Sequence, residues 1–150
     1  MKKLSHVGKD GAAQMVDVGG KPVVARMAAA SATLHCAPAT IRLLKAKALP
    51  KGDVLAVARV AGIQAAKQTP GLIPLCHVLA LESVQVDFAV KARCIAVLCS
   101  VRTRARTGVE MEALTGAAVA ALCLYDMCKA VDKTMRIDGL AVVKKEKSVR

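Results

Sequence analysis

A twelve-residue apolar segment, Ala113–Leu124, constrains the fold most, because Thr115 is its only polar side chain. It lies within a predicted helix over about residues 109–133. A helix that is apolar all round is either buried in a protein or spans a membrane. Twelve residues are fewer than the about 20 that a span needs, and charged residues stand at both ends. We therefore expect this helix to be buried, and we expect no association with a membrane.

Alternation of apolar and polar residues over Leu81–Val90 predicts a strand, and the pattern resumes after a short connection at residues 91–93. The apolar positions on one face are Val84, Val86, Phe88 and Val90, followed by Ile95, Val97, Cys99 and Val101. Two such segments predict an antiparallel hairpin that is covered on one face. Residues 135–143 predict another strand or a hairpin, with Asp138-Gly139 as its turn.

The first half of the chain has weaker patterns. Met15–Val18 predicts a short strand, whereas alanine-rich Val23–Leu34 suggests a helix by composition and a strand by its place among strands. Helices are expected over residues 40–48 and 53–67, the second with Asp53 at the positive end of its dipole.

A proline-stiffened connection follows at residues 70–74 and leads into Leu75-Cys76-His77. Helices and hairpins in this order predict an α+β domain, with a mostly antiparallel sheet and the helices on one face. The 150 residues fit one domain, so we expect a single catalytic domain over residues 1–150.

The formal charge of +12 indicates an anionic partner, unless it only reflects a well-solvated basic surface. The partner would be nucleic acid, a membrane surface or a phosphorylated metabolite. Readers of single strands and RNA stack bases on aromatic rings, and here Phe88 and Tyr125 are the only ones. Nucleic acid is therefore disfavoured, although a clamp on a duplex backbone remains open.

None of the six cysteines forms a C-x-x-C pair, which is half of a common zinc site. The stretch Met1–His6 lacks the apolar run of a signal peptide. We therefore expect reduced thiols, a cytoplasmic protein, no disulfide and no metal site.

Two positions in loops have side chains suited to chemistry. Lys51 precedes Gly52 at the start of a predicted helix, where free N–H groups and the dipole favour phosphate. A solvated lysine at a helix start is the alternative. His77 follows the proline-stiffened connection and could be an acid, a base or a substrate contact, or a hydrogen-bonded structural histidine.

The long predicted helix has further candidates at both ends. Glu110 and Glu112 lie in its first turn, where the dipole alone favours carboxylates. Asp126 and Lys129, spaced i, i+3, can pair on one face and are expected to border a partly desolvated place. A plain surface salt bridge is the alternative.

Arg102, Arg104 and Arg106 alternate, so in a strand they would line one face. This face is most simply a solvated one.

The segments together resemble the cyclic pyranopterin monophosphate synthase family of molybdenum-cofactor biosynthesis. The resemblance covers nearly the whole chain in family order, and its last three segments are highly specific. The matching segments are Met15-Val16-Asp17-Val18, Lys51-Gly52-Asp53-Val54, Ala61-Gly62-Ile63-Gln64-Ala65-Ala66-Lys67, Leu72-Ile73-Pro74-Leu75-Cys76-His77, Thr107-Gly108-Val109-Glu110-Met111-Glu112-Ala113-Leu114-Thr115 and Tyr125-Asp126-Met127-Cys128-Lys129-Ala130-Val131.

The resemblance implies a ferredoxin-like fold and a homohexamer, a trimer of dimers. It implies a lyase that converts (8S)-3',8-cyclo-7,8-dihydroguanosine 5'-triphosphate, supplied by a radical S-adenosylmethionine GTP cyclase, into cyclic pyranopterin monophosphate with release of pyrophosphate. No cofactor is implied. The residues implied are Asp126 as the acid/base, Lys51 and Lys129 as essential lysines, and Leu75, Cys76, His77, Met111 and Glu112 as substrate contacts.

Glu112 and Asp126 are 14 residues apart, which is about 21 Å along a continuous helix. One chain can hardly bring both to one reacting centre, so we expect active sites at subunit interfaces. Two other functions stay open: a basic oligomer that binds nucleic acid, and a non-catalytic family member that acts as a scaffold. A concave pocket centred on Lys51 and Lys129 would favour the enzyme, and a continuous basic stripe would favour nucleic acid.

Overall fold

The computed structural model describes residues 7 and 11–148. Met1–His6, which carries the argument against a signal peptide, lies outside the described residues. The elements in chain order are β1 (Val24–His35), α1 (Pro38–Lys45), α2 (Val54–Lys67), α3 (Thr69–Leu72), β2 (Leu81–Val90), β3 (Cys94–Ala105), α4 (Glu110–Cys128) and β4 (Arg136–Ser148).

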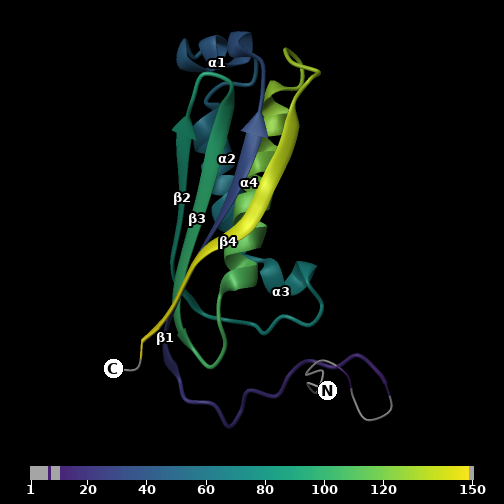
Figure 1. Ribbon diagram of the computed structural model, residues 1–150, viewed down its shortest axis with the longest axis vertical. Helices are drawn as coiled ribbons and strands as arrows, with labels where there is room; N and C mark the ends of the chain where they lie inside the picture. The colour runs from purple at the N-terminus through teal and green to yellow at the C-terminus, as the bar shows by residue number, and fades with distance from the viewer. Residues whose placement is uncertain (1–6, 8–10, 149–150) are drawn as a thin grey trace.

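The four strands form one antiparallel sheet in the order β2-β3-β1-β4. Helices α2 and α4 lie side by side on one face of it, and α1 lies at one end (Figure 1). This is the strand order of a ferredoxin-like fold, in which two split β-α-β units share a sheet. The predictions of an α+β class and of helices on one face are confirmed.

The alanine-rich stretch is the central strand β1, which pairs with β3 on one side and β4 on the other. Ala28, Ala30 and Ala32 are fully buried on the side that faces the helices. Short side chains let α4 approach the sheet closely, so packing overrides the helical preference of alanine. The predicted hairpin is confirmed as β2 and β3, with Val86, Val97 and Val101 buried.

Two predictions about strands are wrong. Met15–Val18 forms no strand but an extended loop. Asp138-Gly139 is not a hairpin turn, because β4 runs straight through it as one strand paired with β1. Gly139, at φ 65°, lies where the register shifts by one residue, so it accommodates a β-bulge and not a reversal.

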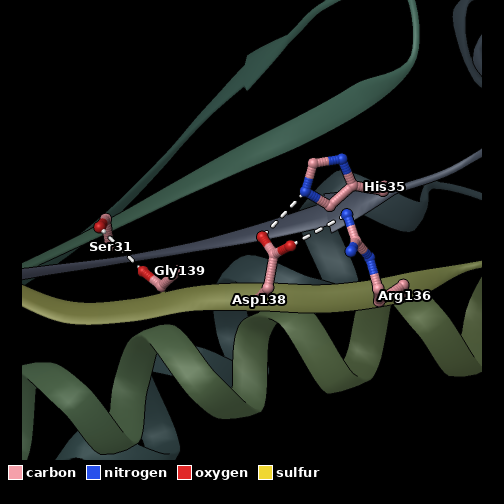
Figure 2. Close-up of polar contacts among 5 residues, drawn as sticks. All are labelled: Ser31, His35, Arg136, Asp138 and Gly139. Atoms are coloured by element: carbon pink, nitrogen blue, oxygen red, sulfur yellow. Dashed lines mark hydrogen bonds and ion pairs between the residues drawn. The ribbon is translucent and has the colours of Figure 1, made fainter.

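Polar side chains link β1 and β4 by hydrogen bonds and ion pairs beside this bulge (Figure 2). The Ser31 hydroxyl donates to the Gly139 carbonyl, and the Asp138 carboxylate lies 2.8 Å from His35 Nε2 and 3.1 Å from Arg136 Nη2. These contacts link β4 to β1 beside the irregular pairing. The strand continues past the predicted end at residue 143 to Ser148.

The long helix α4 ends at Cys128, earlier than predicted, and is buried on one side only. Ala113, Ala117, Ala120, Ala121 and Leu124 have no exposed surface, whereas Leu122 is 59% exposed. The sheet and α2 cover part of its circumference, so the prediction of burial all round is wrong for a single chain. By length and composition α4 could cross a membrane, but half of it is buried in the fold. Core helices of folded domains also pass that test, so this is weak evidence for a span.

Helices α2 and α4 touch through two glycines. A Cβ on Gly62 would lie 2.9 Å from the main-chain oxygen of Gly116 and 3.0 Å from Ala120 Cβ. A Cβ on Gly116 would lie 2.5 Å from the sulfur of buried Cys99. Neither position has room for a Cβ atom. The two helices can therefore approach each other and the sheet this closely only because both residues are glycine.

We expect Gly62→Ala to lower the free energy of unfolding by about 1–3 kcal/mol, because the backbone of α4 must move to admit a methyl group. Gly71→Ala in α3 is the matched control, since nothing lies within 4 Å of its added Cβ. Urea denaturation of both variants measures the difference. Equal stability of the two variants would contradict close packing at Gly62.

Candidate active site

An aspartate held between two lysines lies where the α1–α2 connection meets the last turn of α4. Lys51 Nζ is 2.7 Å from Asp126 Oδ2 and 3.2 Å from the Asp126 main-chain oxygen. Lys129 Nζ is 2.7 Å from the other carboxylate oxygen, Oδ1. The fold therefore brings together the three residues proposed as catalytic, from segments 75 residues apart.

The two lysines set the ionisation of the aspartate. Hydrogen bonds from Lys129 and then from Lys51 lower the pKa of Asp126 to about 2, and the same contact with Asp126 raises the pKa of Lys129. At neutral pH the group is a carboxylate with two ammonium partners. The side chains of Lys51, Asp126 and Lys129 are each about half exposed. The partly desolvated surroundings expected for Asp126 and Lys129 are therefore absent in a single chain.

The loop geometry directs Lys51 toward α4. Gly52 follows in the left-handed region at φ 82°, which is unstrained for glycine, and its N–H donates to Leu49 O. Asp53 is the N-cap of α2 and accepts a hydrogen bond from Ala56 N at 3.0 Å. Asp53 thus satisfies one N–H group in the first turn of α2, and the side chain of Lys51 is directed to Asp126.

A cavity of about 470 Å³ lies at the other end of the molecule, beside the start of α4. Leu75, Cys76, His77, Met111 and Glu112 all line it, so the structure places the five predicted substrate contacts together. The predicted irregular connection is mostly the four-residue helix α3 and the turn after it. Neither Lys51 nor Lys129 lines this cavity, so within one chain the cavity and the two lysines are separate.

His77 has one ring nitrogen fixed by the backbone. Its Nε2 lies 2.8 Å from the Val16 carbonyl, which can only accept a hydrogen bond. Nε2 therefore carries a proton, and Nδ1, which has no hydrogen bond among the residues that the structure describes, can accept one in the neutral ring.

Glu112 is the buried acid of the cavity, with only 3% of its surface exposed. Burial raises its pKa, and the nearby charge of Glu110 adds to this rise, against a hydrogen bond from its own backbone N–H that lowers it. Burial, followed by the charge of Glu112, also raises the pKa of the Cys76 thiol. The cavity thus holds a carboxyl group that takes up a proton more readily than a solvated one.

The two groups of residues are held apart by an unbroken helix. Glu112 lies in the first turn of α4 and Asp126 in the last, and no break folds the ends together. The start of α4 lies near α3 and its end near α1, at opposite ends of the molecule (Figure 1). In one chain the two groups of residues are therefore separate, about 21 Å apart along the helix.

Two cations near the cavity were not predicted from the sequence. Lys21, which follows Gly19-Gly20, lines the cavity. Its position shortly after the family-like segment Met15–Val18 could have indicated that it lies near the substrate contacts. Lys145 of β4 pairs with Glu110, and this contact depends on strand pairing that the sequence pattern did not reveal. Arg102 and Arg104 lie exposed on β3, as predicted for a solvated face.

All six cysteines are free thiols. Within residues 7 and 11–148, no three side chains of His, Cys, Asp or Glu are grouped so that they could hold a metal ion.

We expect Glu112→Gln to raise the melting temperature at pH 8, by an amount that shrinks as the pH falls toward 4. Folding raises the pKa of Glu112, so the native state loses relative stability as pH rises through the interval between its unfolded and folded values. Glutamine keeps the shape and cannot ionise. Thermal unfolding checks this against Glu82→Gln, an exposed carboxylate of β2. No gain at pH 8 would contradict the buried-acid assignment.

Three curated proteins illustrate what the chain is similar to. Proteins named cyclic pyranopterin monophosphate synthase from Chloroflexus aggregans and Streptomyces coelicolor are 53% and 51% identical over 145 and 143 residues. The matches cover 95% of this chain and 88% and 84% of those proteins. A molybdenum cofactor biosynthesis bifunctional protein from Chlorobaculum tepidum is 52% identical over 138 residues, 92% of this chain and 44% of that protein. The family model of the MoaC family matches residues 15–148, and the chain therefore belongs to the MoaC family.

Proposed function

We propose that the chain is a cyclic pyranopterin monophosphate synthase, a lyase of molybdenum-cofactor biosynthesis. Its substrate would be (8S)-3',8-cyclo-7,8-dihydroguanosine 5'-triphosphate, and its products cyclic pyranopterin monophosphate and pyrophosphate. Relatives that are about half identical over almost the whole chain have this name. The observation that carries the proposal is Asp126 held at 2.7 Å by both Lys51 and Lys129.

This ion-pair group suits the proton transfers of the reaction. Opening and reclosing a purine-derived ring requires a group that accepts a proton and one that returns it. Asp126 is ionised and half exposed, so it is available as the base, and Lys129 is a cation beside it that could act as the acid. We assign Asp126 as the acid/base and Lys51 and Lys129 as essential lysines.

The phosphate chemistry needs positive charge. Closing a cyclic phosphate and expelling pyrophosphate builds negative charge on the phosphate oxygens, which fixed cations stabilise. Lys51 and Lys129 provide that charge on one side, and Lys21 lines the cavity at the other end of α4. A triphosphate substrate also accounts for the net charge of +12 better than nucleic acid does.

The cavity at the start of α4 is the proposed substrate-binding half of the site. Leu75, Cys76 and Met111 would pack against the pterin ring, and Glu112 and the Nδ1 atom of His77 would bond to its polar edge. The volume of about 470 Å³ is in the range of small-molecule sites.

We propose that the complete site forms across a subunit interface of a homohexamer, a trimer of dimers. A two-fold axis that set two α4 helices antiparallel would bring Glu112 of one chain beside Asp126 and Lys129 of its partner. The unbroken helix supports this arrangement, as does the exposed Leu122 on α4.

A cytoplasmic location fits this role, because the substrate must come from an enzyme that cyclises GTP. We propose a radical S-adenosylmethionine GTP cyclase as that functional partner, and neither nucleic acid nor a membrane as a ligand. The relative from Chlorobaculum tepidum, named as bifunctional, is consistent with steps of one pathway being coupled.

Incubation with the cyclised GTP intermediate tests the function directly. We expect release of pyrophosphate and a fluorescent pterin product after oxidation. Asp126→Asn should fold and assemble normally and lose at least about 10²-fold in kcat, because amide replaces carboxylate without a change of shape. Asp87→Asn is the control, because Asp87 is an exposed carboxylate on β2 whose one bond within the described part of the chain is with Gln85. Absence of turnover by a correctly assembled wild-type protein would favour a scaffold.

Mixing two inactive variants tests the shared site. Glu112→Ala removes the cavity acid and Lys129→Ala removes the lysine at the opposite end of α4. If sites combine the two ends from different chains, subunit exchange creates some sites with neither change, and we expect part of the activity to return. Exchange is followed separately by mass spectrometry of the mixed assemblies. Fully exchanged hybrids that stay inactive would refute the interfacial site.

A further inference from the structure

Asp132 is a buried carboxylate that the proposed reaction leaves without a role. It lies in the turn after α4, three residues past Lys129, and only 5% of its surface is exposed. Oδ2 accepts hydrogen bonds from Ala37 N at 2.7 Å and from the Thr40 hydroxyl at 2.9 Å. Oδ1 accepts from Thr134 N at 2.9 Å and from its hydroxyl at 2.8 Å. Four donors from two parts of the chain therefore meet at one carboxylate.

This carboxylate joins the start of α1 to the end of α4. The N-cap of α1 is Ala37, which has no side chain able to cap the helix. Asp132 takes that place by accepting from the N-cap amide and from Thr40, and its negative charge suits the positive end of the helix. On its own side, the Asp132 N–H donates to Cys128 O, the last residue of α4. The contact thus fixes α1 relative to the last turn of α4.

The same two elements hold the three charged side chains. Asp126 lies in the last turn of α4, Lys129 is the C-cap of that helix, and Lys51 lies in the connection that leaves α1. That connection is tied back to α1, because Ala46 N and Ala48 N donate to Arg42 O and Leu43 O. Leu49 is also buried, which anchors the connection in the core. Lys51 therefore lies between two fixed points, α1 on one side and the start of α2 at Val54 on the other, and a shift of α1 moves one of them.

We propose that Asp132 is a positioning residue that holds Lys51 in register with Asp126 and Lys129 by clamping α1 to the end of α4. The proposal rests on the proposed function for its effect on turnover, but not for its effect on geometry. Asp132 touches none of the three charged side chains and acts only through the two elements that bear them.

The clamp requires a carboxylate rather than an amide. Burial raises the pKa of Asp132, but the hydrogen bonds from the two amides and two hydroxyls outweigh burial and lower the pKa to about 2. An asparagine would turn an NH₂ group toward one of the two main-chain amides, and neither of these can accept. One main-chain donor would lose its partner: either Ala37 N, which releases the start of α1 directly, or Thr134 N, which loosens the turn that holds the side chain of residue 132.

Asp132→Asn tests the clamp, with Asp138→Asn as the matched control. Asp138 is the carboxylate of β4 that contacts His35 and Arg136 on the open face of the sheet (Figure 2). We expect Asp132→Asn to assemble normally, with kcat reduced about tenfold or more and KM little changed. A displacement of about 1 Å in a catalytic group can cost 10²-fold. The control should keep the wild-type kcat.

A second measurement reports position without turnover. Carbon-13 NMR of labelled aspartate side chains over about pH 1–5 follows the ionisation of Asp126, whose pKa is low because Lys129 and Lys51 bond to it. If Lys51 moves away, the pKa of Asp126 rises in Asp132→Asn and not in Asp138→Asn. This rise would support the clamp even if the wild-type protein turned out to be inactive, which would refute only the proposed function.

An unchanged Asp126 pKa in folded Asp132→Asn, with kcat equal to the control, would overturn the proposal. If Asp132→Asn does not fold, Thr40→Val replaces it, since this change removes one of the four hydrogen bonds and keeps the carboxylate. A smaller shift in the same direction, in both the Asp126 pKa and kcat, is then expected. No shift in Thr40→Val would overturn the proposal equally.

Discussion

The close approach of α4 to the sheet is the constraint on which the rest of the structure depends. Fully buried alanines of β1 face the helices, and Gly62 meets Gly116 where α2 crosses α4. With so few aromatic side chains, the core gains its density from short contacts between backbones and not from large side chains filling gaps. A helix packed this closely stays straight and continuous, and its two ends are thereby fixed at opposite ends of the domain.

The continuous helix α4 keeps the two groups of functional candidates apart. The cavity with Glu112 lies at one end of α4, and the ion pairs of Asp126 lie at the other. Each half is incomplete for the proposed reaction, since one has the shaped cavity and the other has the paired charges. Assembly of several chains is therefore part of the proposed mechanism and not only a means of stabilising the fold.

Three carboxylates show how environment separates residues of similar chemistry. Asp126 is half exposed and its pKa is low because two lysines bond to it. Glu112 is buried with few compensating bonds, so its pKa is raised. Asp132 is buried as well, but four donors surround it and its pKa falls to about 2. At neutral pH the first is an anion paired with two cations, the second takes up a proton more readily than a solvated acid, and the third is a fixed structural anion.

Elements with strong local patterns could be predicted from the amino-acid order alone: the hairpin of β2 and β3, the helix capped by Asp53, and the α+β class. The family-like segments also predicted which residues gather in the cavity and around Asp126. The other features depend on contacts between distant parts of the chain. The alanine-rich stretch forms the strand β1 because it pairs with β3 on one side and β4 on the other. Asp138-Gly139 forms a bulge and not a turn, because β1 continues opposite it. The pair of Lys145 and Glu110 joins residues far apart in the chain, and so do the hydrogen bonds from Ala37 and Thr40 to Asp132. The periodicity of a sequence contains no information about such long-range contacts.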